Sequence, residues 1–80
     1  MDYTVHTPSQ LGTVLRGQRK TSKTSQKEAG AAVGLLPKTI SRLELDTDTA
    51  TIESLFKLLS ALQLELVVRS RRQESSSREW

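Results

Sequence analysis

Residues 26–44 read QKEAGAAVGLLPKTISRLE, and the spacing of Gly, Pro and apolar residues here is the clearest structural pattern in the chain. The pattern predicts a helix over Gln26–Val33, a break at Gly34 and a second helix that begins at Pro37. Gly is favoured just past the end of a helix, and Pro is favoured in the first turn of the next. The sequence therefore predicts two short helices joined by a tight turn.

One face of the second helix is cationic. Lys38, Ser41 and Arg42 are spaced i, i+3 and i+4, so they share one side of a helix. This side offers cations and a hydroxyl donor without an acidic residue, which suits phosphate oxygens and the acceptor edge of guanine. The apolar residues of the same stretch can face a common core: Ala29, Val33, Leu35, Ile40 and Leu43. This division is typical of a helix-turn-helix, whose second helix lies in the DNA major groove.

The same stretch resembles the Xre/Cro-type helix-turn-helix family. The matching residues are Ser25-Gln26, Gly34, Thr39-Ile40-Ser41, Glu44 and residues 51–55. The resemblance covers roughly residues 11–64 and implies a mainly α, lambda-repressor-like bundle of roughly four to five helices. Two departures stand out, because Ala29-Gly30 replaces the usual Leu-Ala and Leu36 stands where Ser or Thr is common. We therefore expect lost core volume and a Gly inside the first helix, and a second helix without a side-chain cap.

The cationic face and the resemblance together predict these DNA-binding residues: Ser25, Gln26, Lys27, Pro37, Lys38, Thr39, Ser41 and Arg42. The polar loop over residues 20–25 allows two interpretations, an ordinary solvated turn or a phosphate clamp. In the clamp, Gln26 and the free N–H groups at the helix N-terminus hold a phosphate oxygen, with Thr24 or Ser25 as the helix cap. We favour the clamp because the family pattern also places a DNA contact at this Gln.

Length and composition allow one small domain. The chain has 80 residues, of which 35% are hydrophobic and 4% aromatic, so we expect a mainly aliphatic core. It contains no Cys and a single His, His6, so neither a disulfide nor a metal site is expected. The sequence shows neither an apolar run as long as a membrane span nor a secretory signal, so we expect a cytoplasmic protein. It also lacks paired carboxylates, a nucleophile–base set and a Gly-rich phosphate loop, so we expect neither an enzyme nor a cofactor.

Charge is unevenly distributed, although the net charge is only +3. Residues 16–42 carry seven basic residues against one acidic residue, a balance of +6. Residues 43–68 carry one basic residue against five acidic residues, a balance of −4. A basic segment points to a polyanionic partner, and together with the helix-turn-helix pattern it favours nucleic acid over a merely solvated surface.

A further helix is predicted before the motif. Thr7 as N-cap and Pro8 in the first turn predict a helix that runs to about Arg19. Gly12 and Gly17 are expected to weaken this helix, so it must rely on packing against the rest of the fold.

A last helix is predicted after an acidic linker over residues 45–50, with Thr51 as its cap. Its apolar stripe is predicted to comprise Ile52, Leu55, Phe56, Leu59 and Leu62. Leu58 is expected to widen this stripe toward a subunit contact.

Residues 64–69 change from helical to alternating spacing, and Val67-Val68 favours a strand. A lone strand leaves its backbone groups unpaired, so it must pair with residues 3–5 or with its copy in a second chain. We favour the second chain, which gives these predicted dimer-interface residues: Leu64, Leu66, Val67 and Val68. The resulting two-fold axis would set two recognition helices about one DNA turn apart, ~34–36 Å, and would match a palindromic operator.

The chain divides into a DNA-binding and dimerisation domain, residues 1–69, and a tail, residues 70–80. The tail is rich in Ser, Arg and Glu and is expected to be disordered. Trp80, the only tryptophan, allows two interpretations: an incidental exposed aromatic, or an anchor for a partner or a protease.

The two ends of the chain narrow the resemblance to the HipB antitoxins. The matching residues are Val5, Thr7-Pro8-Ser9-Gln10-Leu11, Leu62-Gln63-Leu64-Glu65-Leu66 and Glu79-Trp80. This resemblance implies a dimeric repressor of its own operon, with C-terminal strands paired across the dimer and a tail that is labile to proteases. It also implies a toxin partner, a serine/threonine kinase of the HipA type.

Three functions remain as alternatives. The first is an operator-binding antitoxin dimer, and the second is a stand-alone Xre-type repressor without a toxin partner. An adjacent kinase-like reading frame, or a kinase that co-purifies, separates these two. The third is a small helical protein-interaction module, which loss of duplex binding at low salt would favour.

Overall fold

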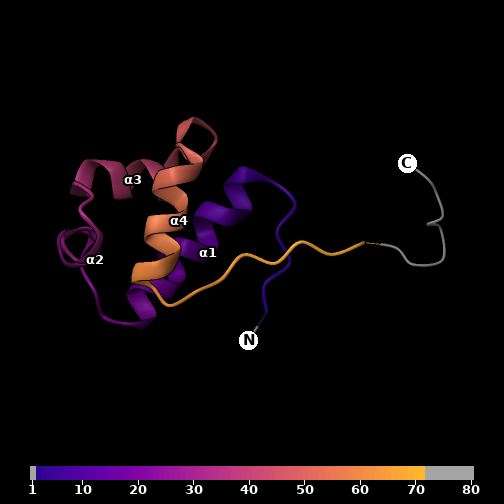
Figure 1. Cartoon of the computed structure of the whole chain (residues 1–80), viewed down its shortest axis with the longest axis horizontal. Helices are drawn as coiled ribbons and strands as arrows, with labels where there is room; N and C mark the ends of the chain where they lie inside the picture. Colours follow the sequence, from indigo (N-terminus) through magenta and orange to yellow (C-terminus); the bar gives the residue numbers. More distant parts are fainter. Residues whose placement is uncertain (1, 72–80) are drawn as a thin grey trace.

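The computed structural model describes residues 2–71, and all of the regular structure in that range is helical. The elements follow in this order: α1 (Pro8–Thr21), α2 (Gln26–Val33), α3 (Pro37–Leu45), the 3-10 turn η1 (Thr47–Thr49) and α4 (Ile52–Ala61). In Figure 1, α2 and α3 lie together at one end, and the segment after α4 runs toward the other end. The predicted mainly helical bundle is confirmed, and α2 and α3 begin where the sequence predicted.

The first two helices begin with reciprocal caps. The N–H of Gln10 donates to the Thr7 hydroxyl, and the N–H of Thr7 donates to the Gln10 side-chain oxygen. Ser25 and Glu28 form the same arrangement at the start of α2. These caps satisfy N–H groups that the start of a helix leaves without partners. Thr7 is therefore the N-cap of α1, as predicted, and Ser25, one of the two predicted candidates, is the N-cap of α2.

The turn between α2 and α3 depends on glycine and on apolar contact. Gly34 has a φ of 76°, the left-handed conformation that Gly adopts without a steric cost. Its N–H donates to the carbonyl of Gly30. Leu36 is the N-cap of α3 and forms no side-chain cap, as predicted. Leu35 precedes it and packs against the core, so an apolar side chain holds the turn where a polar cap is missing.

One aliphatic core joins the helices. Its buried members are Leu15, Ala29, Ile40, Leu43, Leu55, Leu58 and Leu59. α3 contacts each of the other three helices. Burying a Leu or Ile side chain stabilises a fold by about 1.5–3 kcal/mol, so this cluster holds α3 firmly in place.

α4 packs through a different apolar face from the one predicted. Leu58 is fully buried instead of free for a subunit contact, and Ile52 and Phe56 are 67% and 50% exposed instead of packed. The prediction was wrong for these three residues. The sets 52, 55, 56, 59 and 55, 58, 59, 62 are both spaced i, i+3, i+4, i+7, so periodicity alone does not choose between them. Contact with α2 and α3 selects the second set.

Two glycines that carry a cost in helix propensity lie at close approaches of the backbone. A Cβ on Gly12 would overlap the Glu44 carbonyl and the Thr47 side chain, so Gly allows α1 to lie against the end of α3. A Cβ on Gly30 would overlap the carbonyl of Leu35. Gly30, which replaces the Ala that is usual in the family, therefore allows the turn after α2 to lie directly against the helix.

Residues 64–69 do not form a β-strand within the part of the chain that the structure describes. Leu64 packs against the core. The other predicted interface residues are 50%, 65% and 90% exposed, in the order Leu66, Val67 and Val68. Residues 3–5 do not form a strand either, so these two segments do not pair within one chain. Pairing with a second copy stays a prediction.

Candidate nucleic-acid interface

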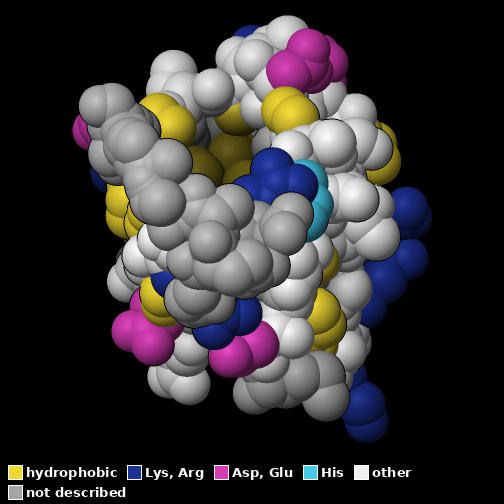
Figure 2. All heavy atoms as spheres, turned by 90° about the vertical axis from the view of Figure 1, so that its right-hand side faces the viewer, with side chains coloured by type: hydrophobic (Ala, Val, Ile, Leu, Met, Phe, Trp, Pro, Cys, Tyr) yellow, Lys and Arg dark blue, Asp and Glu magenta, His cyan; other side chains and the backbone are white. Residues whose placement is uncertain are grey.

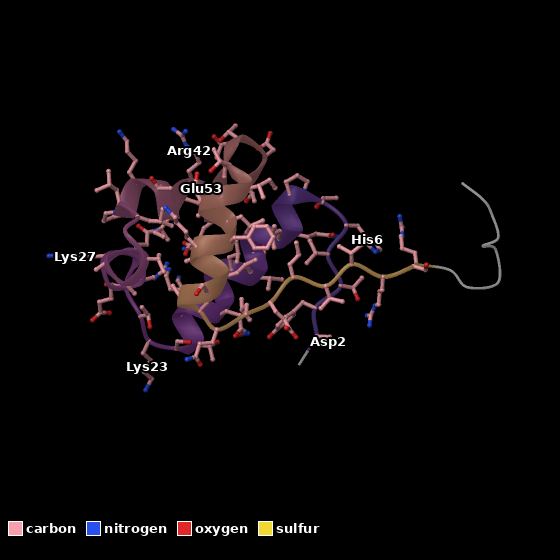
Figure 3. All side chains as sticks on the ribbon, in the orientation of Figure 1. Asp2, His6, Lys23, Lys27, Arg42 and Glu53 are labelled. Carbon is pink, nitrogen blue, oxygen red and sulfur yellow. The ribbon has the colours of Figure 1, made fainter. Side chains whose placement is uncertain are left out.

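α3 presents its cationic face to solvent while its apolar face is anchored. Ile40 and Leu43 are fully buried. On the other side, Lys38 and Arg42 are exposed and Ser41 is half-buried. Figure 3 shows Arg42 pointing outward from α3. A helix held in this way is able to enter a groove without disturbing the core.

The start of α2 adds polar groups to this part of the surface, because α2 packs directly against α3. Lys27 is exposed and points outward from α2 in Figure 3. Ser25 is exposed, although its hydroxyl oxygen accepts the N–H of Glu28. Pro37 is exposed at the start of α3, and Thr39, two residues further along, is half-buried.

Gln26 is held in one orientation. Its Nε2 donates to Glu44 Oε1 at 3.3 Å. Because an ionised carboxylate only accepts hydrogen bonds, this contact fixes the amide nitrogen toward Glu44. The second N–H of the amide and its carbonyl oxygen remain for another partner. In the predicted clamp the remaining N–H would bind the phosphate, since a phosphate oxygen also accepts.

A buried ion pair that the sequence pattern did not predict joins α1 to α3. Arg19 Nε lies 2.6 Å from Glu44 Oε2, and Arg19 Nη2 lies 3.1 Å from Glu44 Oε1. Arg19 Nη1 also donates to the carbonyl of Thr24 at 2.9 Å. The hydrogen bonds to Glu44 raise the pKa of Arg19 above its ordinary value, so the guanidinium stays charged.

Arg19 therefore does not belong to the exposed basic surface, although it lies within the basic segment of residues 16–42. It is only 9% exposed and Glu44 neutralises it. The sequence does contain a signal for the pair. Arg19 follows Leu15 by four residues and Glu44 follows Ile40 by four, so both charges continue core-facing stripes. Opposite charges on two such stripes indicate a buried ion pair.

The remaining surface differs from the α2–α3 end. Lys23, in the loop before α2, points away from the helices in Figure 3. Figure 2 shows the opposite end, where Lys and Arg line one edge and a hollow has hydrophobic side chains at its floor. A cleft of about 380 Å³ lies between residues 5–8 and the start of α4. Within residues 2–71 there is no cluster of His, Cys, Asp and Glu suited to a metal ion. No helix of that range is long and apolar enough to cross a membrane.

Comparison with known proteins agrees with this geometry. Residues 7–68 match the family model described as "Helix-turn-helix". The chain belongs to the helix-turn-helix family. α2 and α3 are accordingly the two helices of the motif, and α3 is the helix that corresponds to the recognition helix.

Within the helix-turn-helix family, the chain is similar to the HipB antitoxins. The chain is 28% identical over 64 residues to Antitoxin HipB of Escherichia coli (strain K12), which covers 80% of this chain and 73% of that protein. A structure named HipA-HipB-O2-O3 complex superposes with a TM-score of 0.85 at 25% identity, over 89% of this chain and 100% of the other. A HipB-O4 20mer complex gives the same four values. The resemblance to the HipB antitoxins is therefore confirmed.

Two predictions for this helix-turn-helix chain fall largely beyond the described residues. Trp80 lies outside them, as does most of the tail over residues 70–80. The division of the chain at residue 69 stays a prediction.

Proposed function

We propose that this chain is the antitoxin of a type II toxin–antitoxin system. In this role it binds a palindromic operator as a homodimer, represses its own transcription and neutralises a HipA-like serine/threonine kinase toxin. The likeness to Antitoxin HipB and to the HipA-HipB-O2-O3 complex supports the proposal. The proposal also includes a cytoplasmic location, where an operator is reached, and a role in binding without catalysis.

The observation that carries the DNA-binding part is the separation of charge on α3. Its two cations, Lys38 and Arg42, are exposed. Its one acid, Glu44, is 5% exposed and paired with Arg19 in the interior. Within Pro37–Leu45, the outward face of α3 therefore presents positive charge without an acid, which is the arrangement that attracts a phosphate backbone.

The test is a gel-shift titration of the full chain against a duplex that covers its own promoter. Lys38→Ala and Arg42→Ala should each weaken binding by about five- to 150-fold, since a base or phosphate contact contributes roughly 1–3 kcal/mol. Lys57→Ala is the matched control, because it removes a cation from α4, where Lys57 pairs with Glu53 at 3.5 Å. Unchanged affinity in both α3 variants would reject the assignment of this face.

The salt dependence of binding separates the kinds of contact. A Lys or Arg that binds phosphate lowers the salt slope by about one when it is removed, a neutral phosphate contact weakens binding without changing the slope, and a base contact changes sequence preference instead. We assign Gln26 and Lys27 to phosphate and the outward residues of α3 to the groove. The other proposed contacts, to be compared in the same titration, are Ser25, Pro37, Thr39 and Ser41.

The toxin part is tested by co-expression of the chain with its neighbouring reading frame. A kinase that co-purifies with the chain and loses activity in the complex supports the antitoxin. Operator binding without such a kinase supports the alternative, a stand-alone Xre-type repressor. If the chain binds no duplex even at low salt, the result would favour the third alternative, a small protein-interaction module. We assign Trp80 to the anchor role, so its replacement should weaken kinase capture while operator affinity is retained.

A further inference from the structure

Leu36, the N-cap of α3, has an apolar side chain that the fold does not use. It is 67% exposed, and it stands where Ser or Thr is common in the family. Its carbonyl accepts the N–H groups of Thr39 and Ile40, so its backbone supports the start of the helix. A Ser or Thr at this position would provide the same carbonyl and a side-chain cap as well. Neither packing nor capping therefore accounts for a Leu here.

The backbone at the start of α3 directs this side chain away from the core. Leu36 has a φ of −78° and a ψ of 153°, which is an extended conformation. Successive side chains of an extended segment point to opposite sides. Leu35 packs against the core. Leu36 therefore points outward at the N-terminal end of α3.

The helix that follows Leu36 presents positive charge to solvent. Lys38 is exposed two residues further on, and Arg42 is exposed one turn after Lys38. Glu44 is the only acid within Pro37–Leu45, and it is 5% exposed and paired with Arg19. A partner that covers Leu36 must therefore carry negative charge and have an apolar group beside it.

We propose that Leu36 contacts the methyl group of a thymine in the major groove of the operator, so that each half-site prefers thymine at one position. The inference rests on the proposed operator binding and deepens it by assigning a residue that determines specificity. A duplex has both features that the surface requires, because phosphates border the major groove and the thymine C5-methyl is the apolar group that base pairs expose in it.

The position of Leu36 on the helix distinguishes it from the other large apolar residue that is exposed on α3. Leu45 is 69% exposed, but it is the last residue of the helix. The N-terminal residues of a recognition helix are the ones that contact base edges. Leu36 is therefore the better placed of the two for a contact with a base.

Replacing thymine by uracil tests the contact directly, because uracil lacks only the C5-methyl group. In a set of promoter duplexes, one thymine position at a time carries uracil, and gel-shift titration of the full chain gives each affinity. At one position, uracil in a single half-site should weaken binding about fourfold, the effect of one methyl group that is no longer buried. Uracil in both half-sites should weaken it about 15-fold. Equal affinity for all of these duplexes would overturn the inference.

Variants of Leu36 assign the effect to this side chain. Leu36→Ala and Leu36→Ser should bind the thymine duplex more weakly and should lose most of the difference between thymine and uracil. Leu36→Ser also supplies a cap to α3, so its weaker binding would not result from a less stable fold. Leu45→Ala is the matched control and should keep the full difference, because Leu45 is equally exposed at the opposite end of α3. An undiminished difference in both Leu36 variants would contradict the assignment.

The unmodified promoter duplex separates this inference from the proposed function. A chain that binds this duplex tightly but does not distinguish uracil from thymine would keep operator binding and lose the thymine contact. A chain that binds no duplex would lose both. If thymine preference is absent and a kinase co-purifies with the unaltered chain but not with Leu36→Ala, the side chain belongs to a protein interface and the inference is rejected.

Discussion

Replacing the buried pair of Arg19 and Glu44 gives an effect whose sign and size follow from the structure. The side chain of Glu44 is 1% exposed and that of Arg19 is 11% exposed, so replacing one partner leaves a charge in a site with little water. Loss of one partner from such a pair destabilises a protein by about 3–5 kcal/mol. For Glu44→Leu we expect about 3 kcal/mol, at the low end of that range, because Arg19 keeps the Thr24 carbonyl at 2.9 Å. For Arg19→Met we expect about 4 kcal/mol, because the more deeply buried Glu44 keeps only Gln26, at 3.3 Å.

The double variant should be far more stable than either single variant. With Arg19→Met and Glu44→Leu together, no charge remains in the interior, and we expect stability within about 1 kcal/mol of the unaltered chain. With single variants at about 3 and 4 kcal/mol, the coupling energy of this cycle should therefore be about 6–8 kcal/mol. Urea unfolding followed by far-ultraviolet circular dichroism gives the four free energies of unfolding. Protein concentration must be held constant, because dimerisation would shift the midpoints.

A surface ion pair supplies the control. Lys57 and Glu53 lie 3.5 Å apart on α4 and are 44% and 81% exposed, so Lys57→Ala should cost less than about 0.5 kcal/mol. If the Arg19 and Glu44 single variants cost less than about 1 kcal/mol each and simply add, the reasoning from burial is wrong. The raised pKa of Arg19 adds a pH test. A raised pKa gives a contribution that is lost only as pH rises through it, so stability owed to Arg19 should stay constant from neutral to moderately alkaline pH.

Five further variants test the start of α3, the close approach at Gly30 and the buried face of α4 by thermal unfolding. Leu36→Ser supplies the cap that α3 lacks and should stabilise the chain by about 1 kcal/mol; a lower melting temperature would contradict this. Gly30→Ala should destabilise by about 1–3 kcal/mol, because its Cβ meets the backbone of the turn, whereas Gly17→Ala, with open space around it, should stabilise by about 0.5–1 kcal/mol; equal effects would reject the close approach at Gly30. Leu58→Ala should cost about 2–5 kcal/mol and Phe56→Ala less than about 1 kcal/mol, and the reverse order would restore the face predicted from the sequence.

The helix boundaries were accessible from the sequence because each one is encoded locally. Thr7 and Ser25 cap helices through residues three positions ahead, and Gly34 and Pro37 act through their own backbone. The exposure of Lys38 on α3 follows from the same short-range logic, because the period of a helix fixes which residues lie opposite the buried ones. These features require no knowledge of which helix packs on which.

The features that sequence reasoning missed depend on contacts between distant segments. Two overlapping stripes on α4 are equally apolar, and only contact with α2 and α3 decides that Leu58 is buried and Phe56 is not. The close approach at Gly12 exists because α1 crosses the end of α3, so the sequence showed only its cost in helix propensity. Arg19 and Glu44 are 25 positions apart, so each local stripe shows that its charge faces the core, but only the packing of α1 against α3 shows that the two charges meet.

The burial of Arg19 changes the uneven distribution of charge only slightly, so a nucleic-acid partner is still favoured. The buried pair removes one cation from residues 16–42 and one acid from residues 43–68, so the two balances fall only from +6 to +5 and from −4 to −3. The pair also keeps the acid of α3 away from the groove-facing side, where it would repel phosphate. One helix thus holds the fold together through Ile40 and Glu44 and presents Lys38 and Arg42 outward. Substitutions on the inward face of α3 should therefore change the free energy of unfolding, and substitutions on the outward face should change operator affinity at constant stability. A variant of Lys38 or Arg42 that lost both stability and operator affinity would show that the two faces are not independent.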